Sequence, residues 1–414
     1  MEKLRKIGFA KLIPLEEALE NLLSRIKCNK METIEVSSSL GRVLANDIMA
    51  PIDIPPFDRA AMDGYAINAE DSFGASPKNP KQVKLIGTID IGQKSEIKVQ
   101  AGTAIRISTG AALPLGADAV IKIEDTDIDN NNVTLFNSVV PGKNVSKKGE
   151  DIKKGQKVLN SGIKIGPEHV ALLASLGITK IKVTKLPIVS IFTTGDELLE
   201  LGYPLEKNKI YNSNLYMIEN LVKKYGGSLH FKETLKDDKD LIIERLNKSI
   251  VNSDLVIFTG GTSVGKKDLL PEIMQENGEV LAHGLAIRPG SPILIAIIKN
   301  KPVFCLPGTP VAAYVCFLRI VGPAISKMLG LDKLDPRVEV FARMERDVPV
   351  SSLGYINFLR VKLEKLKDGY VAIPIRLKGS GIISSLTNSD GIVEIPTNEE
   401  GLKKDSIVKV KLHP

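Results

Sequence analysis

The chain has 414 residues, of which 43% are hydrophobic, and it carries a formal net charge of +7. This length is enough for roughly two to four domains with packed cores. Basic residues are mixed with acidic ones, tryptophan is absent and aromatic residues make up only 5%, so the composition does not indicate nucleic-acid binding. A basic balance is equally suited to small anionic substrates.

No segment of the sequence reads as a targeting signal or a membrane span. The basic residues 1–6 are not followed by the apolar stretch of a signal peptide. The longest apolar run, residues 311–325, is interrupted by Arg319, Gly322 and Pro323, which favours a buried helix. The three cysteines and four histidines lack the spacing of zinc ligands or of a disulfide framework. We therefore expect a cytoplasmic protein without a membrane anchor.

The first part of the chain predicts several short elements. Apolar residues at helical spacing predict a helix over residues 14–27, and a second helix is expected near residues 38–45. Another helix and strand are predicted over residues 167–176 and 178–183. Between these, β-branched runs separated by turns predict a small β-rich unit that is inserted into this region. Its predicted strands cover residues 83–87, 96–99, 104–108, 119–123 and 133–136.

Three polar motifs lie in or beside this β-rich unit. Asp63 belongs to an aspartate–glycine turn between apolar residues, Thr109 follows a predicted strand, and Asp151 follows a basic run. Each pattern is also typical of an ordinary turn or a solvated face. The three motifs alone therefore do not establish a functional site.

From residue 185 onward, strands and helices alternate with a repeat of about thirty residues. This alternation is typical of a doubly wound, mostly parallel α/β sheet with helices on both faces. The predicted strands cover residues 188–192, 228–233, 254–258, 293–298 and 303–306, and the predicted helices cover residues 214–225, 238–252 and 311–329, with a further helix starting near residue 269.

Polar clusters follow these predicted strands at their carboxyl ends, which is where such sheets bind ligands. The strand 254–258 leads into the glycine-rich loop 259–268, whose backbone can approach a ligand closely and whose N–H groups favour an anion. We therefore expect one shared rim that combines an anion cradle with carboxylates. Its candidate members are the loop 259–268 with Asp268, the polar cluster 193–197 with Asp196 and Glu197, and Asp237, Asp238, Pro307 and Gly308.

Several common catalytic motifs are missing from this rim. Lys267 stands where a Walker A loop needs Ser or Thr, and the dinucleotide fingerprint and the nucleophile elbow are absent. Carboxylates beside an anion cradle suit Mg²⁺, which takes oxygen ligands and substrate phosphates. Arg288, Ser263 and the N–H groups near Ser291 would hold a tetrahedral oxyanion. The residues therefore predict a metal-assisted enzyme that acts on a phosphate-bearing substrate, and they do not name that substrate.

The last part of the chain alternates as short strands separated by turns of Gly, Asp and Asn, which predicts a small β-barrel or sandwich. Its hydroxyl-rich loop, residues 378–385, is expected to reach a neighbouring site. The predicted strands cover residues 338–343, 357–363, 369–375, 391–395 and 406–410.

Six motifs, taken together, resemble those of the molybdopterin molybdenumtransferases, the bacterial and archaeal MoeA family, which is similar to the gephyrin E domain. The resemblance covers nearly the whole chain and keeps the order of the motifs. The motifs are residues 55–66, 106–110, 149–151, 193–197, 259–265 with Asp268, and 306–310.

The resemblance implies that the chain inserts molybdate into the dithiolene of adenylylated molybdopterin and releases AMP in the presence of Mg²⁺. It also implies an elongated homodimer, whose site lies between the α/β domain of one chain and the segment 62–64 of the other. The implied regions are an elongated N-terminal region (1–54 plus 146–184), an inserted β-rich domain (55–145), an α/β molybdopterin-binding domain (185–332) and a C-terminal β-barrel (333–414).

The resemblance also assigns roles to single residues. It makes Asp63, Thr109 and Asp151 the contribution of the partner subunit, and it gives Glu197 and Asp268 to the metal. The implied catalytic residues are Asp63, Asp151, Glu197 and Asp268. The implied substrate-binding residues are Thr109, Thr194, Asp237, Gly260, Gly261, Ser263, Gly265, Arg288, Ser291, Pro307, Gly308 and Pro310.

The oxyanion stretch departs from the better-known family pattern. Gly284, Arg288 and Ser291 stand where bacterial members often have lysines, and Thr309 stands where asparagine is common. Because arginine offers a fork of donors instead of a point charge, tungstate is an alternative oxyanion. Two other functions stay open, a molybdopterin adenylyltransferase and a non-enzymatic molybdopterin-binding scaffold. A separate molybdopterin adenylyltransferase is also a candidate partner.

Overall fold

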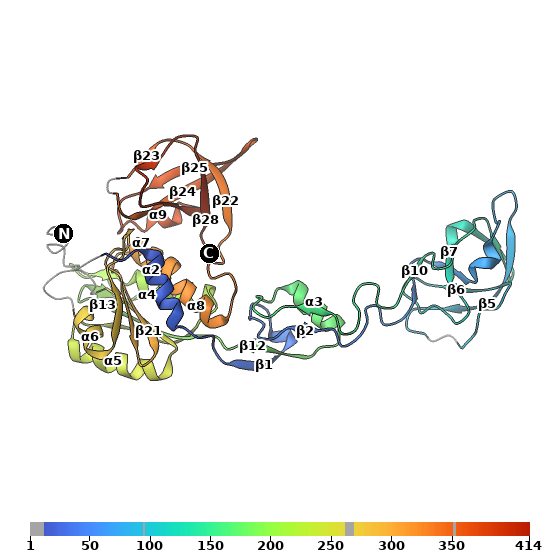
Figure 1. The fold of residues 1–414 in the computed structure, drawn as a ribbon, viewed down its shortest axis with the longest axis horizontal. Coiled ribbons are helices and arrows are strands. Elements are labelled where there is room, and N and C mark those ends of the chain that lie inside the picture. Colours follow the sequence, from blue (N-terminus) through green and yellow to red (C-terminus); the bar gives the residue numbers. More distant parts are fainter. Residues whose placement is uncertain (1–11, 94–95, 261–268, 351–352) are drawn as a thin grey trace.

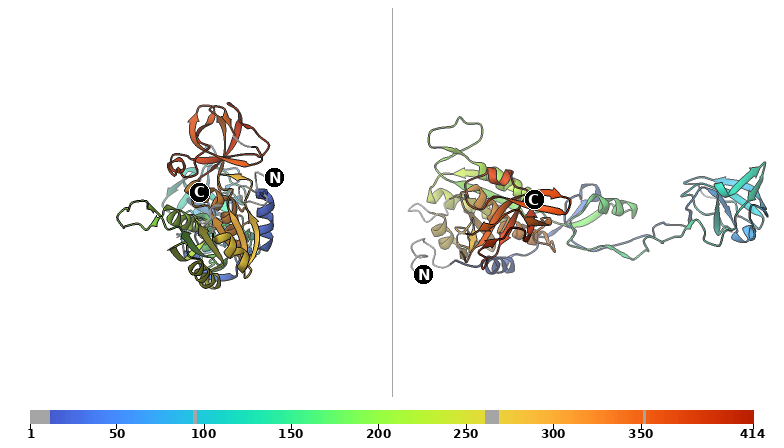
Figure 2. Two further views of the ribbon diagram at one scale, coloured as in Figure 1. Left: turned by 90° about the vertical axis from the view of Figure 1, so that its left-hand side faces the viewer. Right: turned by 90° about the horizontal axis from the view of Figure 1, so that it is seen from above.

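The computed structural model describes residues 12–93, 96–260, 269–350 and 353–414. The molecule is elongated, with an α/β sheet and a β-barrel together at one end and a second, distal β-sheet at the other (Figure 1). A narrow neck joins the two ends, and it consists of short antiparallel pairs and one helix (Figure 2). These neck elements are β1 (Met31–Glu35) with β12 (Lys180–Thr184), β2 (Ile48–Met49) with β11 (Lys157–Leu159), β3 (Arg59–Ala60) with β10 (Val145–Ser146), and α3 (Pro167–Ser175).

The α/β sheet has six strands in the order β16-β13-β17-β21-β20-β18. The first four strands run parallel to one another. The fifth strand, β20, pairs antiparallel with both β21 and β18, so the sheet is mixed. The strands are β16 (Ser228–Leu235), β13 (Ile188–Thr194), β17 (Leu255–Thr259), β21 (Lys301–Leu306), β20 (Leu294–Ile298) and β18 (Glu279–His283).

Helices cover both faces of this sheet, as the alternating pattern predicts. Because successive side chains point to opposite faces, Ile191 and Ile257 face α4 and α8, whereas Phe192 and Phe258 face α5 and α6. The rings of Phe192 and Phe258 lie opposite each other in the register and stack at 5.2 Å between centroids. The helices are α2 (Leu15–Arg25), α4 (Ser213–Lys224), α5 (Lys239–Asn252), α6 (Leu270–Asn277), α7 (Pro310–Cys316) and α8 (Gly322–Leu329).

A single helical run, Pro310–Leu329, passes through the core, and a π-helical stretch, η4 (Phe317–Val321), links α7 to α8. This run is long and apolar enough to cross a membrane, but 89% of its most apolar window is buried inside the protein. Gly322 lets Tyr225 of the α4 C-terminus pack against it, since a Cβ there would lie 2.5 Å from the ring. The run is a core helix, as its interruption by Arg319 and Pro323 predicts.

The C-terminal strands close into a five-stranded barrel, because β24 pairs with both β25 and β26. A sixth strand, β19 (Ile287–Arg288), comes from the α/β part of the chain and pairs in parallel with β24. The barrel strands are β22 (Glu339–Met344), β24 (Ile356–Leu366), β25 (Gly369–Arg376), β26 (Gly391–Ile395) and β28 (Ile407–Leu412). The smaller elements are β23 (Val348–Pro349), β27 (Gly401–Leu402) and α9 (Ser384–Thr387).

The distal sheet has six strands in the order β7-β4-β6-β5-β9-β8 and its own apolar core. Its strands are β7 (Ala119–Lys122), β4 (Gly64–Ile67), β6 (Thr103–Ile107), β5 (Lys81–Ile89), β9 (Asn132–Leu135) and β8 (Thr126–Asp129), and the 3-10 turns η2 (Ala69–Ser72) and η3 (Ile123–Asp125) accompany them.

Two predicted elements do not form. No strand runs over residues 96–99; instead, Val99 donates a single backbone hydrogen bond to Leu115. Residues 38–45 hold only the end of the 3-10 turn η1 (Val36–Ser38), followed by a turn and isolated bridges. The Ser39 hydroxyl donates to the Val36 carbonyl, and Gly41 has a φ of +77°, so local bonds and a left-handed residue replace the helix.

Candidate functional site

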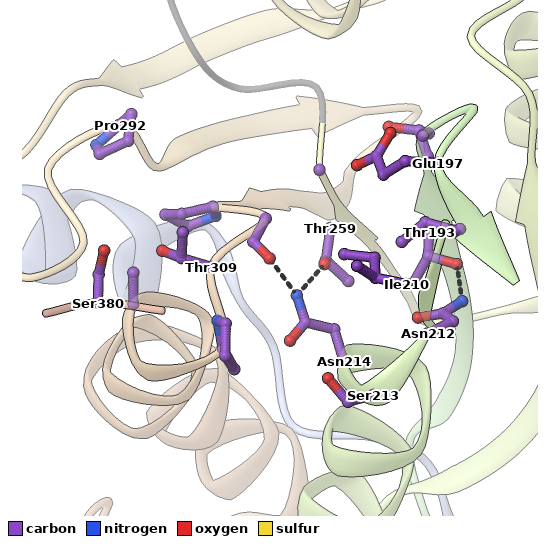
Figure 3. Close-up of a pocket in the computed structure, with 18 of the residues that line it drawn as sticks. Thr193, Glu197, Ile210, Asn212, Ser213, Asn214, Thr259, Pro292, Thr309 and Ser380 are labelled. Atoms are coloured by element: carbon purple, nitrogen blue, oxygen red, sulfur yellow. Dashed lines mark hydrogen bonds between the residues drawn. The ribbon is translucent and has the colours of Figure 1, made fainter. Parts of the chain in front are cut away.

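A pocket of about 690 Å³ opens at the carboxyl ends of β13, β17 and β21 (Figure 3). Its other walls come from the α4 and α7 N-termini, the turn after β19, and Ser380 of the barrel. Nine of the residues predicted from the sequence line it, namely Thr194, Glu197, Asp237, Gly260, Arg288, Ser291, Pro307, Gly308 and Pro310.

The register of the parallel strands explains why these residues meet. Thr193 of β13 pairs with Thr259 of β17, and Thr259 pairs with Leu306 of β21. The three strands therefore end at the same level, and the segments that follow them share one rim. The same register brings Asp237 to the rim, because Thr194 pairs with Leu235 of β16.

The close approach of two backbone segments explains why Gly260 is a glycine. Its φ is +98°, and a Cβ at this position would lie 2.3 Å from the carbonyl oxygen of Thr194. A side chain would therefore push apart the ends of β13 and β17. Gly308 is different, since among the described residues the nearest atoms to a Cβ there would be the Cα and the N of Gly260, at 3.4 and 3.9 Å.

Two asparagines at the start of α4 connect the strand ends (Figure 3). The Asn214 amide donates to the Thr259 hydroxyl at 3.1 Å and to the Gly308 carbonyl at 2.8 Å. The Asn212 amide donates to the Thr193 hydroxyl at 2.5 Å, and its oxygen accepts from Leu215 N–H as the helix cap. The sequence argument missed both residues, although an asparagine before a helix is a recognisable cap signal.

Two buried acceptors in the pocket lining have no hydrogen-bond partner among the described residues. They are Asn214 Oδ1 and Thr194 Oγ1, in side chains whose residues are only 7% and 4% exposed. The Gly308 carbonyl fixes the orientation of the Asn214 amide, so its oxygen is the atom left over. Because an unpaired buried polar atom is costly, both atoms are suited to accept hydrogen bonds from a bound ligand.

The carboxylates of the rim face solvent. Glu197 and Asp237 are exposed and line the pocket, whereas Asp238 caps α5 by accepting from Leu241 N–H at 2.9 Å. No group of three His, Cys, Asp or Glu side chains with metal-site spacing occurs within the described ranges. One or two carboxylates together with substrate phosphates still match the oxygen donors that Mg²⁺ takes, so the residues present fit this ion.

The arginine wall of the pocket depends on the turn after β19. Arg288 is exposed, and its guanidinium carbon lies 4.3 Å from the centre of the Tyr355 ring. The Ser291 hydroxyl donates to the Ile287 carbonyl at 2.6 Å, so in this structure it stabilises the turn. Gly290 is required here, because a Cβ would lie 2.7 Å from Cys316 Sγ.

Four of the predicted residues, Gly261, Ser263, Gly265 and Asp268, lie outside the described residues. The three remaining ones do not line the pocket: Asp63 precedes β4 and Thr109 follows β6 in the distal sheet, and Asp151 belongs to the neck. Asp63 accepts from Thr109 N–H at 2.6 Å and from the Thr109 hydroxyl at 2.8 Å. These bonds, the backbone one first, lower the pKa of Asp63 below its usual range.

Asp151 lies in the neck beside the isolated bridge between Ile54 and Ile152, and its N–H donates to the Ile54 carbonyl at 3.1 Å. Its side chain is exposed. In a single chain, the Asp63–Thr109 pair, Asp151 and the pocket therefore lie at three separate places.

Three family models match the chain along most of its length. They are the MoeA N-terminal region (domain I and II) over residues 13–177, a probable molybdopterin binding domain over residues 190–327, and the MoeA C-terminal region (domain IV) over residues 342–412. The second model contains the strand ends and the turn of the pocket, and the first contains Asp63, Thr109 and Asp151.

Individual relatives agree with these models. A molybdopterin biosynthesis protein of Methanocaldococcus jannaschii is 39% identical over 97% of this chain and 98% of its own length. A molybdopterin molybdenumtransferase of Staphylococcus epidermidis is 36% identical over 97% of this chain and 95% of its own. The crystal structure of a molybdopterin biosynthesis MoeA protein from Pyrococcus horikoshii has a TM-score of 0.85 at 39% identity, covering 97% of this chain and 99% of that one. The chain therefore belongs to the MoeA family of molybdenum cofactor biosynthesis proteins.

Proposed function

We propose that this protein inserts molybdate into adenylylated molybdopterin and releases AMP. The observation that carries the proposal is the convergence of nine predicted residues, from five separate strand ends and turns, on one pocket of about 690 Å³. A pocket of this size, with a few polar groups among apolar ones, suits a small ligand such as a nucleotide-bearing substrate. The name of the Staphylococcus epidermidis relative supports the same reaction.

The chemistry of each pocket residue indicates its role in the proposed reaction. Glu197 and Asp268 would hold Mg²⁺, which when bound neutralises the charge on the phosphates of the substrate. Arg288 supplies a planar fork of donors for molybdate, with tungstate as the alternative oxyanion. The N–H groups of the glycine-rich loop 259–268 cradle the phosphates. Asn214 Oδ1 and Thr194 Oγ1 accept hydrogen bonds from the ligand, which satisfies both atoms.

We also propose that the active site is completed by a second copy of the chain. Asp63 adjoins β4 of the distal sheet and Asp151 belongs to the neck, whereas the pocket lies in the α/β sheet at the opposite end of the molecule (Figure 1), so in this proposal both aspartates reach a pocket from a partner subunit. In this proposal the chain divides into the regions 1–54 with 146–184, 55–145, 185–332 and 333–414. The cytoplasmic location and a contact with the molybdopterin adenylyltransferase stay predictions.

The decisive experiment measures AMP release from adenylylated molybdopterin in the presence of molybdate and Mg²⁺. We expect Asp268→Ala to abolish AMP release, because the phosphates lose a metal ligand. Asp240→Ala is the matched control, since this aspartate is exposed on the first turn of α5 and does not line the pocket. Full AMP release by the Asp268→Ala protein would contradict the proposed site.

Mixing two inactive variants tests the shared site. A heterodimer of Asp63→Ala and Asp268→Ala chains keeps one intact site, so random mixing should restore roughly a quarter of the wild-type activity. An inactive mixture that still forms heterodimers would contradict the partner contribution. Formation of pyrophosphate from ATP and molybdopterin would instead favour the adenylyltransferase, and binding without either reaction would favour the scaffold.

A further inference from the structure

The barrel contributes to the pocket at two points. Its loop residue Ser380 lines the pocket, and the Ser380 carbonyl accepts from Val311 N–H of α7 at 3.0 Å. Its strand β24 pairs with β19, which carries Arg288. Two walls of the pocket are therefore hydrogen-bonded to the barrel, although most of the pocket is built by the α/β sheet.

The pairing of β19 with β24 holds the backbone of Arg288 in place. Ile287 and Arg288 of β19 lie opposite Ile356 and Asn357 of β24. The Ile356 N–H donates to the Ala286 carbonyl at 2.9 Å, which continues the pairing toward the start of β19. The backbone on which Arg288 stands is therefore held in the barrel sheet.

The backbone that carries the ring beneath the arginine is hydrogen-bonded as well. Tyr355 immediately precedes β24, and its neighbour Gly354 donates a backbone hydrogen bond to the Thr397 carbonyl at 2.9 Å. The Tyr355 carbonyl accepts from the Asn357 side-chain amide at 3.0 Å. The backbone of Tyr355 is therefore held on both sides, and the centre of its ring lies 4.3 Å from the guanidinium carbon.

We propose that Tyr355 is a positioning residue, which holds the Arg288 guanidinium in the orientation that receives the oxyanion. A free arginine side chain has many rotamers, and stacking on an aromatic face removes most of them. The N–H groups of a guanidinium lie in its plane, so stacking occupies its face and leaves the in-plane geometry that matches an oxyanion. This inference rests on the proposed function, and it adds that the barrel helps to determine oxyanion affinity.

The test compares apparent KM for molybdate with kcat in the AMP-release assay, together with direct calorimetric binding of molybdate. At exposed sites such a contact contributes about 0.5–1 kcal/mol, so Tyr355→Leu should raise KM roughly twofold to fivefold with kcat nearly unchanged. Tyr355→Phe keeps the ring face and should restore the wild-type KM. Tyr370→Leu is the matched control, since this partly exposed tyrosine of β25 does not line the pocket.

A double-mutant cycle separates positioning from a merely structural role. In an Arg288→Ala background, Tyr355→Leu should have no further effect on KM, because the group that it orients is gone. An equal rise in that background, or a wild-type KM for Tyr355→Leu, would overturn the inference. If Tyr355→Leu does not fold, Tyr355→Met replaces it, with retained thermal unfolding as the check. An unchanged KM in Arg288→Ala itself would instead count against the oxyanion contact in the proposed function.

Discussion

Gly260 and Gly308 lie next to each other at the floor of the pocket, and alanine should have different effects at the two positions. A methyl group at Gly260 would lie 2.3 Å from the Thr194 carbonyl oxygen, and the φ of +98° is unfavourable for an L side chain. At Gly308 the nearest atom of the described residues is a carbon at 3.4 Å, and the backbone is outside the left-handed region. The two substitutions therefore form a matched pair.

The expected magnitudes follow from these contacts. A left-handed conformation costs a non-glycine residue about 1–2 kcal/mol. Overpacking against a backbone oxygen that is fixed in a sheet costs about 1–3 kcal/mol more. We therefore expect Gly260→Ala to lower the free energy of unfolding of the α/β sheet by roughly 2–5 kcal/mol. Gly308→Ala should change this free energy by less than about 1 kcal/mol. Because alanine has fewer conformations than glycine in the unfolded chain, the change should be a small gain in stability.

Urea denaturation followed by circular dichroism measures the free energy, and hydrogen exchange assigns the loss to β13 and β17. Exchange should accelerate at the ends of these two strands in Gly260→Ala and stay unchanged in Gly308→Ala. Equal stability of the two variants, with unchanged exchange, would refute the close approach of the two strand ends. A large loss in Gly308→Ala alone would refute the assignment of which glycine is required.

Three further predictions concern single side chains. Burial alone would raise the pKa of Asp335, but the hydrogen bonds and charge of Arg337 outweigh it and lower the pKa from 3.8 to about 2. This difference of about 1.8 corresponds to about 2 kcal/mol of folding stability. The stabilisation is present above pH 3.8 and is lost as the pH falls through 2. Asp335→Asn should therefore lower stability at pH 7 by at least that amount in urea denaturation, with a smaller effect at pH 2.5; an equal effect at both values would contradict this. Thr109→Val should raise the pKa of Asp63, measured by NMR titration of the carboxyl, because one of its two hydrogen bonds is removed; an unchanged value would show that the hydroxyl does not matter. Asn214→Ala should lower the free energy of unfolding by about 1–3 kcal/mol, because the buried Thr259 hydroxyl and the Gly308 carbonyl lose their donor; an unchanged melting curve would contradict this stabilising role.

The strand ends of the site were predictable because their signals are local. Short β-branched runs, alternating with helices, place the carboxyl ends of neighbouring parallel strands at one edge, so Thr194, Asp237 and Pro307 could be assigned to one rim. The glycine at position 260 was also a local signal, although the reason for it, the Thr194 carbonyl, is a contact across strands. Alternation and turns also predicted a small β-barrel or sandwich, and the structure has the closed barrel.

What the sequence could not predict depends on pairing between distant segments. Nothing local in Ile287 and Arg288 indicates that they pair with β24 of the barrel, and the contact with Tyr355 follows from that pairing. The sheet is mostly parallel, as the alternation predicts, but β20 runs against its neighbours β21 and β18, because a two-residue turn at Lys299 and Asn300 returns the chain directly into β21. The hydrogen bonds of Asn214 could not be predicted either, because they depend on which atoms lie above the α4 N-terminus.

The pairing of β19 with β24 also limits how the chain can be divided. The barrel is closed by its own five strands, so it resembles a detachable module with a complete core. Its removal would nevertheless leave β19 as an exposed edge with unpaired N–H and C=O groups, which is a template for aggregation. It would also withdraw Ser380 from the α7 N-terminus. A shortened protein that ends before the barrel would therefore carry a pocket with two altered walls, and its ligand affinity would not represent that of the full chain.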